Sequence, residues 1–404
     1  MTLSKYIHIS KYLILLSITC IYVSFILIFA KINFENNISG FFYIGQKYKW
    51  QPLLPNGAFI HKNDGYDGQF YLYIAQDPFI LKGPEEKYQY IDSPAYRYQR
   101  IVFPLISFIL SRGDKEKIPY IFILINLSSL IAGSWIIILM CKLENKPLSY
   151  SFFYAFSTGF LISIMRNLVE PLASFFAICG IYFYFRKKFE KMSLAFTFSV
   201  LTKETFALMP LGIMIQIFFE TFLSLIKINK VPDDKKLISK KIFFSIIPIL
   251  SFFIWQLYIF KQFGKFSYQE GMGNMGFPFY GIIEKTYSLY LNSLISYRSL
   301  FEMLSFSSIL LIFIFLIYNI FAKKNPLLGI GLVYIVFISL YSKDIWCEFY
   351  SFSRVANELF IIAILYLINI KKKFLKVPLI FNSIIFFIAL LGFLGKANIF
   401  IRFL

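Results

Sequence analysis

Long runs of apolar residues, separated by short polar connections, dominate this chain and predict helices that cross a membrane. Several of the runs reach the roughly 20 residues that a helix needs to span a bilayer. The predicted spans are residues 12–30, 118–140, 148–165, 168–185, 192–202, 205–226, 242–260, 303–322, 326–341, 355–370 and 377–395. The runs are continuous rather than alternating, so we expect an all-α, polytopic transmembrane protein and not a β-barrel. Its membrane segments number roughly 11 or 12, depending on the short apolar stretch 101–112.

Basic residues collect in particular connections between the apolar runs and predict the orientation of the chain. The clusters are Lys5 with Lys11, Lys142 with Lys146, residues 186–191, residues 227–241, Lys323 with Lys324, and residues 371–376. All of them fall on one side if segment 101–112 does not cross the membrane, and the positive-inside rule makes that side cytoplasmic. We therefore expect a multi-pass protein of the cell inner membrane with a cytoplasmic N-terminus. If segment 101–112 does cross, every assignment after it is reversed.

Two connections are long, and both fall on the predicted extracytoplasmic side. Residues 31–100 form the first loop, and residues 261–298 form the second loop, which contains the glycine-rich stretch GMGNMGFPFYG. Loops of this length in a compact protein are usually functional. The apolar run at 12–30 is longer than the core of a signal peptide and no A-x-A site follows it, so we interpret it as an uncleaved first helix. The chain, 1–404, is expected to form a single integral membrane domain.

Composition supports a membrane protein and excludes several other classes. The chain is 58% hydrophobic and carries a formal net charge of +19. Its basic residues are scattered among the apolar runs and do not form one face, so nucleic acid is not an expected partner. The four cysteines lack the spacing of a disulfide framework or a zinc site, and His8 and His61 are the only histidines. A metal site built on histidine is therefore not expected.

The stretch NDGYDGQFYLYIAQDPF, residues 63–79, is unusually acidic for this chain. A helix that begins at Tyr66 places four residues on one apolar face: Phe70, Tyr71, Ile74 and Ala75. Asp64 or Asp67 stands at its N-terminus, where a helix favours a hydrogen-bond acceptor, and Pro78 ends it. We expect a short amphipathic helix on the outer membrane surface, in which Asp67 either only caps the helix or carries chemistry.

Other ionisable residues interrupt the apolar runs, and the predicted topology places them on the same side as Asp67. They are Arg97, Arg100, Arg166, Glu170, Lys203, Glu204, Glu348, Arg354 and Glu358. Charged groups at membrane depth are costly and usually face a cavity. Such a cavity suits a lipid phosphate, because the arginine fork binds phosphate and a carboxylate can take a proton from an acceptor hydroxyl. The pattern favours sugar transfer from a polyprenyl-phosphate donor.

Four motifs strengthen this interpretation: YDGQFYLYIAQDPF, YRYQRIVFPL, NLVEPLA and LTKET. Together they resemble a group of bacterial multi-spanning glycosyltransferases of the GT-C type. They are also similar, more distantly, to the membrane mannosyltransferases that add the second mannose in glycolipid-anchor assembly. The similarity covers the first half of the chain. The second half matches only loosely, through the second loop and the tetrapeptide SFSR.

The resemblance implies a GT-C-like fold and an inverting transfer from a polyprenyl-phosphate-linked sugar to a glycan, lipid or protein acceptor on the extracytoplasmic side of the membrane. It places the catalytic carboxylate on Asp67, with Asp64 and Asp77 as further candidates. The residues that it implies for phosphate, substrate or cavity contact are Arg97, Arg100, Glu170, Lys203 and Glu204. Arg166 and Arg354 are further candidates for substrate binding, because they are ionisable residues that interrupt the apolar runs on the same side. The tandem acidic pair of some relatives is absent here. Use of a divalent metal therefore stays open, and no metal ligand is assigned.

Two other functions remain open at this point. A transporter or flippase of a lipid-linked saccharide would bind in the same cavity without reacting, and it predicts polar groups deep inside several helices. Another membrane transferase, such as an acyltransferase, ligase or phosphotransferase, usually needs a histidine or a nucleophile in a matching loop. Only His61 lies near the acidic stretch, six residues before Asp67.

Overall fold

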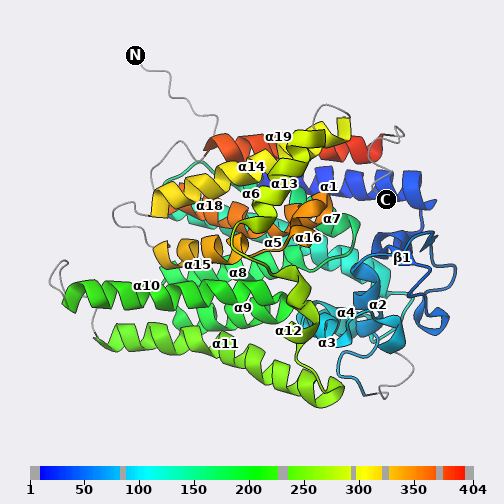
Figure 1. Ribbon diagram of the computed structural model, residues 1–404, viewed down its shortest axis with the longest axis horizontal. Helices are drawn as coiled ribbons and strands as arrows, with labels where there is room; N and C mark the ends of the chain where they lie inside the picture. The colour runs from blue at the N-terminus through cyan, green and yellow to red at the C-terminus, as the bar shows by residue number, and fades with distance from the viewer. Residues whose placement is uncertain are drawn as a thin grey trace.

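The computed structural model describes residues 10–81, 88–225, 235–292, 297–320, 327–369 and 376–395. These residues are helical almost throughout, and their only strands are β1 (Ile44–Gly45) and β2 (Ile60–His61), which pair in parallel. In this part of the chain seven helices are long and apolar enough to cross a membrane. The predicted all-α, polytopic membrane fold is confirmed (Figure 1).

Each of the seven long helices overlaps a predicted span. They are α1 (Lys11–Phe34), α5 (Ile118–Leu143), η4 with α10 (Glu204–Ala207 and Leu208–Leu225), α11 (Lys235–Phe263), α14 (Tyr297–Ile320), α17 with α18 (Phe349–Val355 and Asn357–Asn369), and α19 (Lys376–Leu394). Where further spans were predicted, the structure has shorter helices: α6 (Tyr150–Ala155), α7 (Thr158–Met165), α8 (Glu170–Phe185), α9 (Phe189–Thr202) and α15 (Leu328–Ser339). The predicted span 148–165 is therefore broken between α6 and α7.

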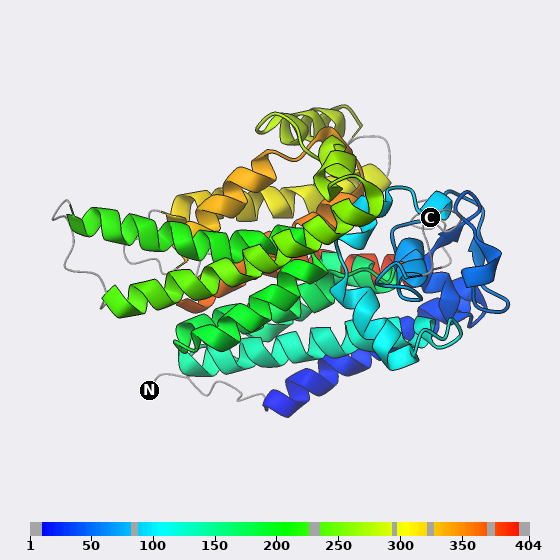
Figure 2. The ribbon, with the colours of Figure 1, turned by 90° about the horizontal axis from the view of Figure 1, so that it is seen from below.

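The first loop leaves and re-enters the helical bundle at the same end. Phe42, shortly after α1, packs on Phe122 of α5 with ring centroids 4.9 Å apart. At the other end of the same two helices, Lys11 lies over the ring of Trp135. The helices α1 and α5 are therefore antiparallel, and α4 (Val102–Ser111) lies beside α2 (Gly68–Ile74) and α3 (Pro94–Tyr98) at the loop end (Figure 2). Because α1 ends and α5 begins at this end, segment 101–112 between them does not pass from one end of the bundle to the other.

The described basic clusters gather at the opposite end of the bundle. Lys240 in the first turns of α11 pairs with Glu190 of α9 at 3.2 Å. Lys376 at the start of α19 lies over the ring of Tyr150 in α6. Lys5, residues 227–234 of the cluster 227–241, Lys323 with Lys324, and residues 371–375 lie outside the described residues. The described basic clusters thus lie at one end of the bundle, as predicted. The assignment of that end to the cytoplasm stays a prediction.

The first loop folds as a packed layer over the ends of the helices. After η1 (Ile38–Phe42) and η2 (Gln51–Leu53), the helix α2 contacts η1, β1, α3 and α4. All seven of its residues are buried. The prediction of an amphipathic helix on the membrane surface, extending from Tyr66 to Pro78, is therefore wrong. Its polar residue Gln69 is accommodated inside the layer, because its side chain accepts from the Gly45 N–H at 3.0 Å.

The second loop covers the same end of the bundle. It contains α12 (Ser267–Gly271), η5 (Met272–Asn274) and α13 (Tyr280–Asn292). The carboxylate of Glu270 accepts from the backbone N–H of Tyr96 in α3 at 3.2 Å. In addition, α13 packs on α16 (Lys343–Cys347). Both predicted extracytoplasmic loops thus meet above α9, α11 and α17.

Substitution of Gly68 by alanine tests the close approach between the first loop and the bundle. A Cβ at this position would lie 2.2 Å from the backbone oxygen of Arg166, so one of the two backbones must shift. We expect the substitution to lower the stability by about 1–3 kcal/mol, the usual cost of overpacking. The melting temperature of the purified protein measures this loss. Gly273→Ala is the matched control, because a Cβ there meets no atom within 4 Å.

Candidate functional site

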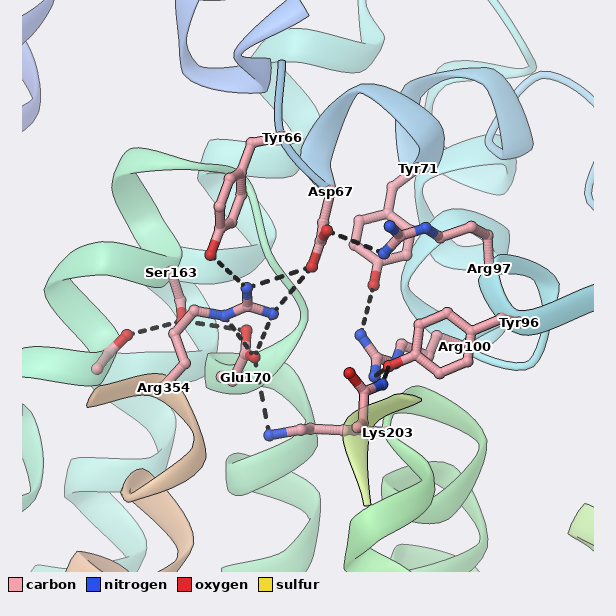
Figure 3. A network of polar contacts seen from close by, with 12 residues as sticks. Tyr66, Asp67, Tyr71, Tyr96, Arg97, Arg100, Ser163, Glu170, Lys203 and Arg354 are labelled. Atoms are coloured by element: carbon pink, nitrogen blue, oxygen red, sulfur yellow. Dashed lines mark hydrogen bonds and ion pairs between the residues drawn. The ribbon is translucent and has the colours of Figure 1, made fainter. Parts of the chain in front are cut away.

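A cavity of about 1010 Å³ lies between the two loops and the ends of the helices. Its lining includes seven of the ionisable residues that the sequence predicted: Asp67, Arg97, Arg100, Glu170, Lys203, Glu204 and Arg354. They come from the first loop, from the junctions of short helices, and from α17. Hydrogen bonds and ion pairs join Asp67, Arg97, Arg354, Glu170 and Lys203 into one group (Figure 3). Arg100 and Glu204 pair with each other beside this group. The predicted convergence of charges on a single cavity is therefore observed.

Asp67 lies at the centre of this network rather than serving as a helix cap. It occupies the N-cap position of α2, but its side chain accepts no hydrogen bond from that helix. One carboxylate oxygen, Oδ1, lies 2.9 Å from Nη1 of Arg97. The other, Oδ2, accepts from both Nη1 and Nη2 of Arg354 at 3.2 Å. The side chain of Asp67 is thus held between two guanidinium groups.

The arginines keep Asp67 ionised. Burial by itself would raise the pKa of the Asp67 carboxyl. The positive charges of Arg97, Arg354 and Arg100 outweigh burial and hold this pKa well below its ordinary range. The carboxylate is therefore present at every physiological pH, but it attracts a proton only weakly while both arginines contact it.

Arg97 and Arg100 each make a forked contact with a carboxylate other than Asp67. Arg97 donates through Nε and Nη2 to the two oxygens of Asp92, at 2.8 and 2.7 Å. Arg100 makes the same forked contact with Glu204, at 2.9 and 2.6 Å. Such paired hydrogen bonds fix the plane of a guanidinium group.

The third arginine, Arg354, is held from the bundle side. Its Nε donates to Glu170 at 3.0 Å, and its Nη1 donates to the hydroxyl of Tyr66 at 2.9 Å. Glu170 also lies 3.7 Å from Nζ of Lys203. Lys203 in turn pairs with Glu358 at 2.9 Å. Because these side chains are almost completely buried, the network forms the floor of the cavity.

The other two candidate aspartates lie away from the cavity. Asp64 is exposed at the surface of the first loop. Asp77 is buried, and its Oδ1 accepts from the backbone N–H of Leu81 at 2.9 Å. Neither residue lines the cavity, so of the three predicted catalytic carboxylates only Asp67 is placed to meet a ligand there.

Arg166 is the one predicted substrate-binding residue that does not line the cavity. It is 2% exposed, and its guanidinium group lies 3.5 Å from the ring centroid of Tyr43. The rings of Tyr66 and Tyr350 lie at 5.1 and 4.9 Å. These cation–π contacts tie the first loop to α17 and support Tyr66 where it touches Arg354. Arg166 therefore packs behind the site.

His61 stacks on the outer side of the same cluster. Its ring lies 3.6 Å from that of Tyr43, and its Nε2 lies 3.3 Å from the carbonyl oxygen of Gly40. Burial lowers the pKa of His61 to about 4, and the charge of Arg166 acts in the same direction. The imidazole is therefore neutral in the folded protein at neutral pH.

Acidification is expected to destabilise the protein in part through His61. Because the unfolded chain binds this proton more tightly, the contribution of His61 to stability is fully present above pH 6.5 and is lost as the pH falls to about 4. We expect the melting temperature of His61→Gln to decline less than that of the wild type across this window. Parallel declines of the two proteins would contradict a buried, neutral His61.

Several residues of the network were not predicted as site residues. They are Asp92 and the tyrosines at positions 66, 71 and 96, whose hydroxyls contact Arg354 or Arg100. Asp92 had a usable signal, since an acid followed by Ser-Pro at a helix start and then by Arg97 favours a local ion pair. The tyrosines had none, because the chain contains 28 of them.

The carboxylates of the cavity are already paired with cations. Asp67, Glu170 and Glu204 each contact at least one arginine. In the parts of the chain that the structure describes, no group of three or more histidine, cysteine, aspartate or glutamate side chains is arranged to hold a metal ion. The donor set therefore does not fit a divalent metal as it stands.

No protein-family model, curated protein or solved structure matches this chain at a significant level.

Proposed function

We propose that this protein transfers a sugar from a polyprenyl-phosphate-linked donor to an acceptor on the extracytoplasmic side of the inner membrane. The observation that carries the proposal is a single cavity with a charged floor and an apolar wall. Arginines and carboxylates line one part, whereas Phe252, Phe253 and Phe337 line another. Phe252 lies about 16 Å before the end of α11 at Phe263, so the apolar wall extends toward the membrane interior. A lipid phosphate has this division of polar head and apolar tail.

The proposed chemistry assigns distinct roles to the charged groups. Asp67 takes the proton from an acceptor hydroxyl as its oxygen forms a bond to the anomeric carbon. The bond between that carbon and the phosphate oxygen breaks on the opposite face, which inverts the sugar. Arg97 and Arg354 stabilise the negative charge that develops on the leaving phosphate, and Arg100 adds positive charge nearby without contacting the phosphate. Glu170 and Glu204 position the arginines.

A transfer assay tests this proposal. The full-length protein, in lipid nanodiscs, is incubated with a panel of radiolabelled polyprenyl-phosphate sugars and with candidate lipid, glycan and peptide acceptors. We expect labelled product together with one equivalent of polyprenyl phosphate. Folded protein that yields no product with any donor in the panel would contradict the proposal.

A second candidate, a transporter or flippase of a lipid-linked saccharide, is favoured by a separate polar cluster inside the bundle. Ser157, at the break between α6 and α7, donates to Asn357 of α18. Next to it, Thr158 contacts Asn382 of α19 at 3.3 Å, and all four side chains are buried. Vesicles that accumulate labelled lipid-linked saccharide in one leaflet without forming product would favour this candidate over the transferase.

A further inference from the structure

The arginines next to Asp67 are anchored independently of it. Arg97 is oriented by the forked contact from Asp92, which uses Nε and Nη2 and leaves Nη1 directed at Asp67. Arg354 is oriented through Nε by Glu170 and through Nη1 by the hydroxyl of Tyr66. If the Asp67 side chain moved away, each guanidinium group would still have an ionic partner.

Asp67 has no comparable anchor. Its two carboxylate oxygens contact Arg97 and Arg354, and its own helix donates no hydrogen bond to its side chain. The side chain is 22% exposed, whereas that of Glu170 is 1% exposed. It also lines the open cavity, so a rotation of the side chain can take it out of the arginine pair.

The Asp67 carboxylate lies at a position that is suited to bind an anionic ligand. Two guanidinium groups, held by separate elements, direct N–H groups at it from α3 and from α17. Phosphate oxygens accept the same paired N–H donors as a carboxylate does. A site of two anchored arginines that is filled by an unanchored carboxylate is therefore a preformed anion site occupied from within the protein.

We propose that Asp67 occupies a phosphate subsite formed by Arg97 and Arg354, and that the phosphate ester of the substrate displaces it. The anchors Asp92 and Glu170 hold the two guanidinium groups during this exchange. Arg100 is not part of the subsite, because Glu204 and the hydroxyls of Tyr71 and Tyr96 occupy its donors. The pair that binds phosphate is thus Arg97 with Arg354, and not the Arg97 with Arg100 of the sequence motif.

This exchange rests on the proposed function, because it takes the anion to be the phosphate of the sugar donor. It makes the proton affinity of Asp67 depend on whether the donor is bound. The charged and titratable groups that face Asp67 are Arg97, Arg354, Arg100, Tyr66 and Tyr71. Once phosphate neutralises the nearest two arginines, the carboxylate regains proton affinity. The base then becomes effective only when the donor is bound.

Carbodiimide labelling of the wild-type protein tests the exchange directly. The reagent modifies protonated, accessible carboxyl groups, and peptide mass spectrometry reports the extent at each position. Addition of the anion is expected to increase labelling of Asp67 about tenfold for each unit by which its pKa rises. Glu204 is the internal control, since its partner Arg100 lies outside the subsite. Phosphate binding with unchanged or reduced labelling of Asp67 would overturn the proposal.

Two probes separate the sources of the anion. Inorganic phosphate carries the charge alone, and a short-chain polyprenyl monophosphate adds an apolar tail. Exchange with both probes supports a general phosphate subsite, and exchange with the polyprenyl probe alone supports a lipid headgroup subsite. If neither probe changes the labelling of Asp67 at saturating concentration, the subsite does not exist.

Two substitutions with opposite expected effects complete the test. Asp67→Asn removes the competing charge, so the polyprenyl monophosphate is expected to bind about tenfold more tightly. Asp92→Asn loosens the anchor of Arg97 and is expected to weaken binding of the same probe by a similar factor. Affinities are measured by isothermal titration in nanodiscs. Weaker binding to Asp67→Asn would mean that Asp67 only supports the fold of the site.

The labelling and binding experiments test the phosphate subsite independently of the transfer assay. Exchange without sugar transfer from any donor would contradict the proposed function and leave the subsite intact. Sugar transfer without exchange at Asp67 would support the proposed function and contradict the phosphate subsite.

Discussion

Replacement of Asp67 by asparagine is expected to lower the rate of sugar transfer about 10²- to 10⁴-fold, the usual contribution of a general base. Asparagine has nearly the shape of aspartate but takes no proton from the acceptor hydroxyl. Arg97 and Arg354 keep their anchors in this variant, so the cavity is expected to persist. Initial rates at saturating donor measure the effect. Combined with tighter phosphate binding, the slow transfer would separate the chemical role of Asp67 from any role in substrate affinity.

Asp64→Asn is the matched control for this substitution. Asp64 lies three positions before Asp67 in the same acidic stretch, but it is exposed and does not line the cavity. Its substitution is therefore expected to leave the transfer rate unchanged. A large loss in Asp64→Asn, or an unaffected rate in Asp67→Asn, would contradict the assignment of the base to Asp67.

Replacement of Glu170 by glutamine is expected to give the largest loss of stability of any single substitution in the network. Glu170 is 1% exposed and lies 3.0 Å from Arg354 and 3.7 Å from Lys203. Its removal takes the buried negative charge from between two buried cations, which keep Asp67 and Glu358 as their ionic partners. Loss of one member of a buried ion pair typically costs about 3–5 kcal/mol. Glutamine keeps the volume of the side chain, so the measured loss isolates the charge. Equilibrium unfolding in mixed micelles measures the free energy.

The pair of Glu190 with Lys240 provides the control for Glu170. The two residues join α9 to α11 at the opposite end of the bundle, and both are largely exposed to solvent. An exposed ion pair gains little in water, so Glu190→Gln is expected to leave unfolding unchanged. Equal losses of unfolding free energy in Glu170→Gln and Glu190→Gln would show that burial does not determine how much an ion pair stabilises this protein.

Sequence reasoning predicted the helical class but not every break in the helices. Apolar length alone predicted a single span over 148–165, because neither Phe156 nor Ser157 is a helix breaker. The break is stabilised by distant residues: the hydroxyl of Tyr22 donates to the carbonyl oxygen of Ala155 at 2.6 Å. Asn357 accepts from Ser157. Partners so far apart in sequence leave no local signal.

The candidate site was easier to predict in outline than in detail. Charged residues in apolar surroundings must find partners, so convergence of Arg97, Glu170 and Lys203 could be expected from composition and topology. The sequence could not show that Asp67, and not Asp64 or Asp77, lines the cavity. The three aspartates share one short stretch and differ in the direction of their side chains. The position of Arg166 behind the site likewise depends on tyrosines that are distant in sequence.

The contact between Asp67 and Arg354 joins positions that are 287 residues apart in the chain. During synthesis from the N-terminus, the acidic loop is complete long before the ribosome reaches α17. Asp67 can pair with Arg97 at that stage, but the second half of the anion site is supplied only when one of the last helices enters the membrane. The site is therefore assembled at the end of biosynthesis, and a chain truncated before Arg354 lacks it however well its first helices are inserted.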